Sequence, residues 1–238
     1  MDVYWCVFPT VMINDSNQQL PLINYYEPSP GYEKIKNIKD TENSGFKMCP
    51  SIKEQQKNVF NLKFPFDYEL SFTNDTVQSS MYDQYFFDSY VKIRSVKDKI
   101  LSFSTYYGFF TEEDLQIQVT GCYLADNDFV NKTVFFPGTY NISKWFRPLE
   151  CSYYLKRCVD NITIDRGDEY LSVQFLTNEK ITLKKFYLTD RLKEISQSIL
   201  ASKSYKSKSV YKLSQWYDMF NQSKFRSLIL KEIKNNLL

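Results

Sequence analysis

Short runs of alternating apolar and polar residues recur along the chain up to about residue 187. Clear examples are 59–64, 91–96, 115–119, 161–164 and 170–175. Such alternation is typical of strands that bury one face of a sheet. Turn-forming residues separate the runs, and no helical pattern lies between them. The pattern predicts a mainly β domain over 1–187, folded as an antiparallel β-sandwich or barrel.

The pattern is weakest between residues 10 and 58. This stretch mixes Pro, Asn and Lys with few periodic apolar residues. We expect it to be an irregular region of arms and loops, with one short helix near 51–58.

From about residue 188 the apolar residues no longer recur at every second position but at every third or fourth position. The apolar positions in this part are Leu188, Leu192, Ile195, Ile199, Val210, Leu213, Trp216, Phe220, Phe225, Leu228, Ile229, Ile233 and Leu237. This spacing predicts two or three amphipathic helices over 188–238. A Ser/Lys-rich stretch at 202–209 predicts an exposed link after the first of them.

A helical appendage of this length must cover its apolar stripes. The cover is either the β domain itself, a second copy of the chain or another protein. For the last two cases the candidate anchors are Trp216, Phe220, Phe225, Leu228 and Ile229. We therefore expect a protein partner or a homo-oligomer through these helices if they do not pack on the β domain.

The composition narrows the possible chemistry, because the chain contains no histidine. Histidine-based triads and histidine-ligated metal sites are therefore excluded. No glycine-rich phosphate loop is present, and we expect no metal and no cofactor. The 30 basic and 28 acidic residues nearly balance. The four lysines at 203, 206, 208 and 212 supply only modest attraction for phosphates, so we do not expect a nucleic-acid partner.

The remaining signals concern the cellular compartment. The start of the chain has an acid at residue 2 and no basic segment, which does not resemble a signal peptide. No stretch of 18 apolar residues predicts a transmembrane helix, and we expect no membrane association. The five cysteines are odd in number and form no C-x-x-C pair, which favours reduced thiols in a cytoplasm.

One polar constellation could bind a small ligand. Trp145 and Arg147 stand at a corner beside Pro148, where an indole can stack and a guanidinium can hold an anion. Asp165, Arg166 and Asp168 occupy a polar turn and could supply a base or further charge. These five residues would form a site if they met in one pocket. The alternative is that the corner anchors a strand turn in the core and the carboxylates are solvated.

A further indication of fold comes from the order of several short motifs. A strand, a polar turn with Gly167 and a second strand make a hairpin over 162–175. It follows Met48-Cys49-Pro50, Phe64-Pro65-Phe66-Asp67 and Trp145-Phe146-Arg147-Pro148 in the chain. Over about 46–187 this order resembles an uncharacterised family of tailed-phage proteins, of the type found in phages of marine cyanobacteria.

The resemblance implies a compact jelly-roll, cupin-like or β-clip-like β domain and a phage origin, and it brings no activity with it. Cupin-type iron ligands cannot be drawn from a chain without histidine. We therefore expect a non-enzymatic interaction or virion-associated protein, located in the cytoplasm of an infected bacterial host or in the virion. The alternative is a small-molecule-binding protein, or a histidine-independent enzyme, that uses a β-barrel pocket.

Overall fold

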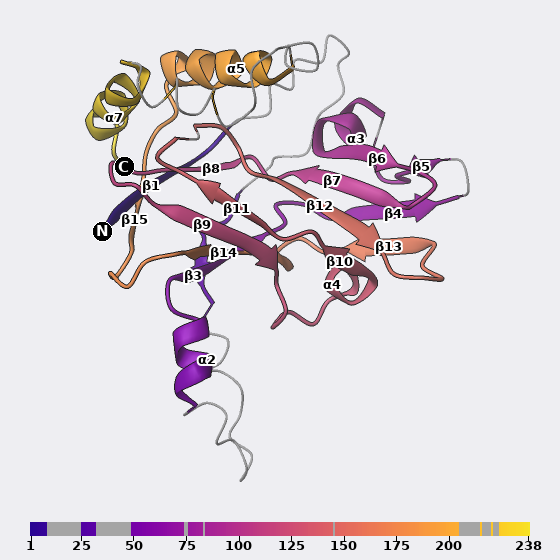
Figure 1. Ribbon diagram of the computed structural model, residues 1–238. Coiled ribbons are helices and arrows are strands. Elements are labelled where there is room, and N and C mark those ends of the chain that lie inside the picture. Colours follow the sequence, from indigo (N-terminus) through magenta and orange to yellow (C-terminus); the bar gives the residue numbers. More distant parts are fainter. Residues whose placement is uncertain are drawn as a thin grey trace.

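The computed structural model is mainly β and places two C-terminal helices against one side of the β strands (Figure 1). It describes residues 1–8, 25–31, 49–73, 76–82, 84–144, 146–204, 215, 220 and 224–238. The expected antiparallel β architecture with helices near the C-terminus is confirmed. The layered sheets enclose a common core, as in a β-sandwich.

Four sheets build the β part. The first is β15(Thr182–Lys185)-β1(Asp2–Val7)-β8(Tyr107–Phe110), and the second is β10(Thr133–Phe135)-β12(Glu150–Leu155)-β7(Ile100–Ser104)-β6(Val91–Ser95). The third is β11(Gly138–Asn141)-β9(Gln116–Gly121)-β14(Glu169–Phe175)-β3(Val59–Lys63)-β2(Ser29–Pro30), and the fourth is β13(Asn161–Ile164)-β4(Tyr68–Phe72)-β5(Val77–Gln78). The β1–β15 pair is parallel, and the other pairs are antiparallel.

Five helices are described: α2(Pro50–Gln55), α3(Gln84–Tyr90), α4(Asp128–Lys132), α5(Asp190–Ser204) and α7(Phe225–Asn235). The helix expected near 51–58 is α2. The expectation that no helix interrupts the strands is wrong, because α3 and α4 do so. The Asn127 side chain caps α4 by accepting a hydrogen bond of 2.9 Å from the Val130 amide. The link expected at 202–209 is wrong at its start, because α5 continues to Ser204. The rest of this link, and most of the helix expected around Val210–Phe220, lie outside the described residues.

Aromatic side chains fill the main core between the sheets. Phe64 stacks on Tyr170 with ring centroids 4.0 Å apart, and it meets Phe129 edge to face. Edge-to-face and offset contacts of this kind add to the gain from burying the rings. The main core also holds Val3 and Trp5 of β1 and Leu171 and Val173 of β14.

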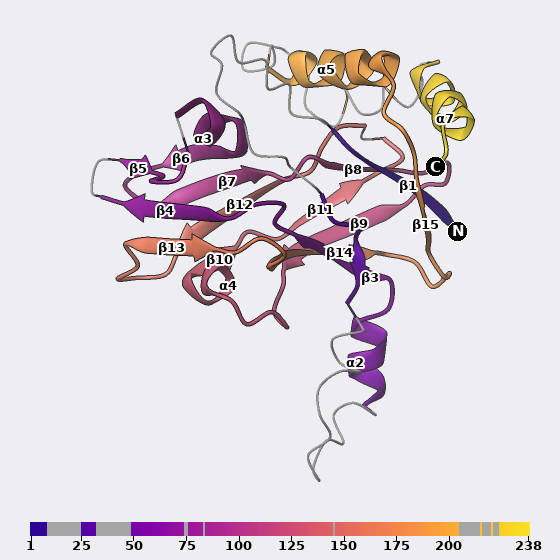
Figure 2. The ribbon, with the colours of Figure 1, turned by 180° about the vertical axis from the view of Figure 1, so that it is seen from behind.

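A second core lies on the opposite side of β1 and β8. Tyr4, Cys6 and Phe110 face it from the strands, and Leu192 of α5 and Ile233 of α7 face it from the helices. Figures 1 and 2 show α5 and α7 together on this side of the molecule. Helices α5 and α7 therefore pack on the β domain, which was the first of the three possible covers for the apolar stripes of this part of the chain.

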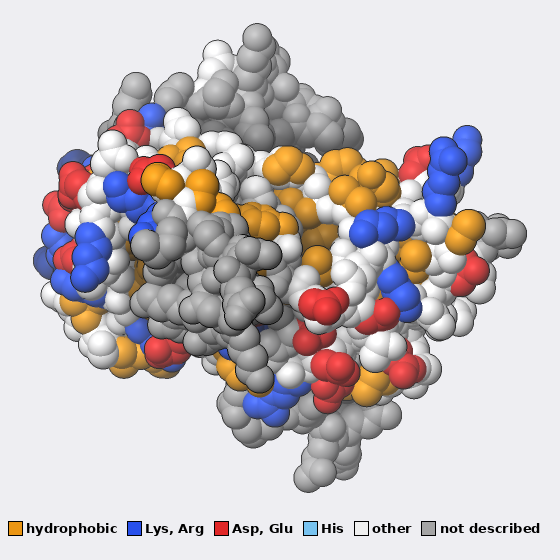
Figure 3. Space-filling view, turned by 90° about the horizontal axis from the view of Figure 1, so that it is seen from below, with side chains coloured by type: hydrophobic (Ala, Val, Ile, Leu, Met, Phe, Trp, Pro, Cys, Tyr) orange, Lys and Arg blue, Asp and Glu red, His pale blue; other side chains and the backbone are white. Residues whose placement is uncertain are grey.

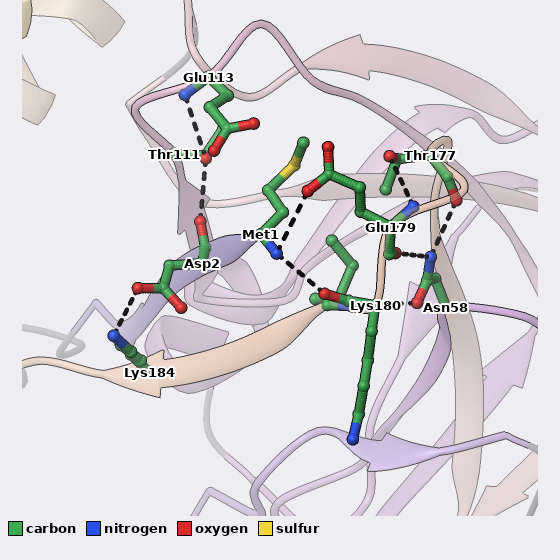
Figure 4. A network of polar contacts seen from close by, with 10 residues as sticks. Met1, Asp2, Asn58, Thr111, Glu113, Thr177, Glu179, Lys180 and Lys184 are labelled. Atoms are coloured by element: carbon green, nitrogen blue, oxygen red, sulfur yellow. Dashed lines mark hydrogen bonds and ion pairs between the residues drawn. The ribbon is translucent and has the colours of Figure 1, made fainter.

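Polar contacts fix the connection between β14 and β15 (Figure 4). The Asn58 amide nitrogen donates to the carbonyls of Thr177 at 2.9 Å and Glu179 at 2.7 Å, and its oxygen accepts from the Ile181 amide at 3.2 Å. Asp2 pairs with Lys184 across the parallel strands. These contacts hold β15 beside β1.

Candidate functional site

The corner that contains Arg147 faces the second core. Phe146 packs against Phe8 and Phe110, with ring centroids 5.8 and 5.4 Å apart. Arg147 is only 5% exposed. Burial raises the pKa of the Tyr140 phenol above its usual value, and the nearby Arg147 guanidinium partly offsets this increase. Trp145, the other predicted residue of this corner, lies outside the described residues.

Asp165, Arg166 and Asp168 do lie together, in the turn between β13 and β14. The Arg166 amide donates to the Asp67 carboxylate at 2.7 Å, and the Arg166 guanidinium lies 5.9 Å from the Tyr26 ring centroid. Asp168 accepts a bond from the Phe64 amide through its backbone carbonyl, at 2.9 Å. Gly167 has a φ of +93°, which favours glycine. These contacts fasten the hairpin to the β3–β4 connection.

The two parts of the predicted ligand site contact different regions of the molecule. The corner packs on β1 and β8, whereas the turn is bound to the β3–β4 connection. A surface hollow of about 550 Å³ lies between α2 and the end of β14, where Glu54, Lys57, Gln174 and Asn178 line it. Neither Arg147 nor the turn contributes to this hollow. The contacts thus give no support to a shared pocket.

The structure also shows a buried polar cluster that the sequence analysis missed. The Glu169 carboxylate accepts from the Asn61 amide at 2.9 Å, and the Cys122 sulfur lies 3.7 Å from it. The Ser172 hydroxyl donates to Asn61 at 2.8 Å. Asn127 donates to the backbone carbonyl of Glu169 at 2.9 Å. No spacing signal reveals this cluster, because β3, β9 and β14 are far apart in sequence. The four side chains that bond to one another are all buried, and they are Asn61, Cys122, Glu169 and Ser172. This cluster therefore stabilises the region where β3, β14 and β9 meet.

Helix α7 has one buried and one open side. Ile229, Leu230 and Ile233 are buried in the second core. Ile229 was predicted to anchor a partner, and this is corrected: it is 0% exposed and packs inside the molecule. Phe220 and Leu228 are partly buried against the same core, and Trp216 lies outside the described residues.

Two of the other predicted anchors, Phe225 and Leu228, border the open side of α7. Phe225 is 53% exposed. Phe225 and Leu228 line a hollow of about 400 Å³, together with Lys224, Ser227 and Lys231. A shallow apolar hollow bordered by two lysines can accept an apolar side chain that has an acidic neighbour.

One further surface shows no dominant charge. On the underside of the molecule, basic, acidic and hydrophobic side chains lie side by side (Figure 3). Within the described ranges, no group of three or more Asp, Glu or Cys residues is placed to hold a metal ion. None of the helices in the described part is both long and apolar enough to cross a membrane.

Comparisons with known protein families, with curated proteins and with solved structures find no match to this chain. The functional argument therefore depends on the geometry of the chain itself.

Proposed function

We propose that this chain is a non-enzymatic interaction protein of phage origin, acting in the cytoplasm of an infected bacterial host or in the virion. The resemblance of residues 46–187 to the tailed-phage family, with its cupin-like or β-clip-like domain, supports the origin. The open side of α7 supports the interaction role.

The observation that carries the interaction role is the exposure of Phe225 on a helix that is otherwise well anchored. The opposite side of α7 is fixed in the second core by Ile229 and Ile233. The hollow beside Phe225 and Leu228 is therefore presented on a rigid support. Aromatic side chains on rigid supports are typical centres of protein interfaces, because they lose little conformational entropy on binding.

Charge indicates the chemistry of the partner. Residues 224–235 contain four basic side chains and one acidic side chain, Glu232. Lys234 pairs with Glu112, whereas Lys224 and Lys231 form no ion pair with a described residue. Two copies of this surface would place like charges together, which is unfavourable. We infer that the partner is an acidic amphipathic protein segment, and not a second copy of the chain.

Two synthetic amphipathic helical peptides test this proposal. Both carry the same leucine stripe, and their polar faces carry only glutamate or only lysine. Fluorescence anisotropy with the full chain should show binding of the glutamate peptide and much weaker binding of the lysine peptide. Added salt should weaken the binding, because exposed charges are screened.

A double variant, Phe225→Gln with Leu228→Gln, should weaken binding of the glutamate peptide at least about tenfold, because two apolar contacts are lost. Leu176→Gln is the matched control, because Leu176 is also an exposed apolar residue but lies after β14. Equal binding of both peptides, or no effect of the double variant, would contradict the proposal. Light scattering that shows a dimer disrupted by the double variant would identify a second copy as the occupant instead.

A further inference from the structure

The sheet β10-β12-β7-β6 has one face in the main core and one face open. Tyr153, Leu101 and Phe103 point into the core. Their neighbours in the strands alternate to the other face, where Tyr154 is 38% exposed. Phe136 continues β10 and is 44% exposed, with its amide bound to the Ser152 carbonyl at 2.9 Å.

The two exposed rings form a pair on the open face. Their centroids are 5.5 Å apart, and the rings are tilted by 55°. Tyr154 lies opposite Val134 on one side and Ile100 on the other. This end of the face therefore offers aromatic surface in a fixed position.

The opposite edge of the same face is cationic. The Arg94 Nε donates to the Ser102 hydroxyl at 2.9 Å, and Ser102 and Ser152 share a hydrogen bond of 2.6 Å. Glu150 pairs with Lys92 at 3.0 Å and with Arg94 at 3.6 Å. One carboxylate thus orients two cations over the sheet and neutralises only one of their charges.

The segments around this face also contain more basic than acidic residues. The four strands, with residues 96–99 and 156–157 that follow β6 and β12, contain six basic and two acidic residues. The whole chain has 30 basic and 28 acidic residues. Lys99 is paired with Asp160 at 2.9 Å, which leaves an excess of three positive charges near this face.

We propose that the open face of β10-β12-β7-β6 binds single-stranded nucleic acid. Bases stack on Phe136 and Tyr154, and the phosphates lie toward Lys92 and Arg94. The distance from β12 to β6 spans two strand spacings, about 10 Å. Exposed rings beside a basic groove are the combination that recognises single strands without sequence preference. Between the rings and the cations, Ser152 is partly exposed and Ser102 is buried next to Arg94, so the middle of the face is polar. A protein-binding surface is typically apolar at its centre, unlike the polar centre of this face.

Fluorescence anisotropy with the full chain and labelled oligonucleotides tests this site. The probes are short oligothymidylate, short oligouridylate and a DNA duplex of equal length. Either single strand should bind more tightly than the duplex, and the difference between DNA and RNA would identify the source of the ligand. Failure of both single strands to bind at about 50 mM salt, where phosphate contacts are strong, would overturn the proposal.

Variants separate stacking from apolar contact. The double variant Phe136→Leu with Tyr154→Leu retains apolar bulk but removes the rings, and it should weaken binding by about tenfold for each stacked base. Tyr187→Leu is the control, because Tyr187 is an exposed aromatic residue outside this sheet. Circular dichroism of each variant checks that the fold is intact. Unchanged affinity of a folded double variant would overturn the proposal.

The salt dependence of binding tests the contribution of the cationic edge. Lys92→Gln with Arg94→Gln removes two phosphate contacts, so the slope of log affinity against log salt should fall in magnitude by about 1.4. An unchanged slope would mean that the phosphates do not lie at β6 and would overturn this placement. The site lies apart from α7, so its failure would leave the proposed protein interaction untouched.

Discussion

Asn58 combines an uncommon backbone conformation with three hydrogen bonds from one side chain. Its φ is +55°, in the left-handed region. Its amide group binds the backbone of Thr177, Glu179 and Ile181. Asparagine tolerates this conformation better than most residues, and glycine tolerates it best.

Asn58→Gly should lower the free energy of unfolding by about 2–3 kcal/mol, because three hydrogen bonds are worth about 1 kcal/mol each. Asn58→Ala should lose about 1 kcal/mol more, because alanine is strained at this φ. Chemical denaturation measures both effects. Asn178→Ala, in the same connection, should be nearly neutral. A Gly variant as stable as the wild type would show that the side-chain bonds contribute nothing.

Cys49 precedes α2, and the backbone amides of Ile52 and Ser51 lower the pKa of its thiol. Burial has the opposite effect on Cys151, raising the pKa of that thiol to about 12. The thiolate is the reactive form.

Alkylation followed by peptide mass spectrometry should therefore modify Cys49 in the folded protein and leave Cys151 intact. The rate at Cys49 should rise with pH and level off with a midpoint below the value measured for the same cysteine in the urea-unfolded chain. A midpoint at or above that value would show that the amides do not stabilise the thiolate. Urea should make Cys151 reactive as well.

At the scale of elements, α7 shows how one helix can serve two purposes. Ile229→Ala and Ile233→Ala should each lower the free energy of unfolding by about 2–5 kcal/mol, because each leaves a cavity in the second core. Phe225→Ala, on the open side of the same helix, should cost less than about 1 kcal/mol. Denaturant titration of the three variants makes the comparison. Equal losses would mean that α7 is not docked as described.

The success of the sequence analysis depended on how each element is buried. Strand β13 matches the expected 161–164, because its burial alternates strictly. β1 and β8 lie in the expected β region but were not among its clear examples, since both faces of these strands are covered and their apolar residues run without alternation. The Asp126-Asn127-Asp128 triplet contained the capping residue of α4, a signal that could have revealed this helix.

The candidate sites were harder to predict than the strands. The helical spacing of apolar residues identified the apolar stripe of α7. Phe225 and Leu228 line the hollow on the open side of this helix. The spacing could not distinguish them from Ile229, because it gives the relative directions of the side chains, whereas only the docked helix shows which direction faces the core. Arg147 and the Asp165–Asp168 turn illustrate another limit. Spacing along the chain does not determine which distant segments meet.

At the scale of the whole molecule, the dense aromatic core links stability to alkaline pH. Burial raises the pKa of the phenols of Tyr68, Tyr107, Tyr153 and Tyr170 above the usual value. In the unfolded chain these groups lose their protons near pH 10, whereas in the folded protein they keep them. The unfolded state then binds fewer protons, so stability falls as pH rises above about 10.

Four such phenols would give a loss of up to about 5 kcal/mol per pH unit above that point. Far-UV circular dichroism should therefore show a steep unfolding transition at alkaline pH. Phenolate absorbance of these tyrosines should appear together with the loss of structure. If all 19 tyrosines titrate while the fold remains intact, the burial described for these four is wrong.

The parallel pairing of β1 with β15 has a consequence for biosynthesis. Asp2 lies opposite Thr182, so β1 must wait for a partner strand that is synthesised 180 residues later. At ordinary rates of translation that interval is roughly 10–40 s. Throughout it, the apolar residues of β1 lack the strand that borders them in the finished protein. Nascent chains of this protein should therefore be substrates for chaperones that hold exposed apolar segments until β15 has been synthesised.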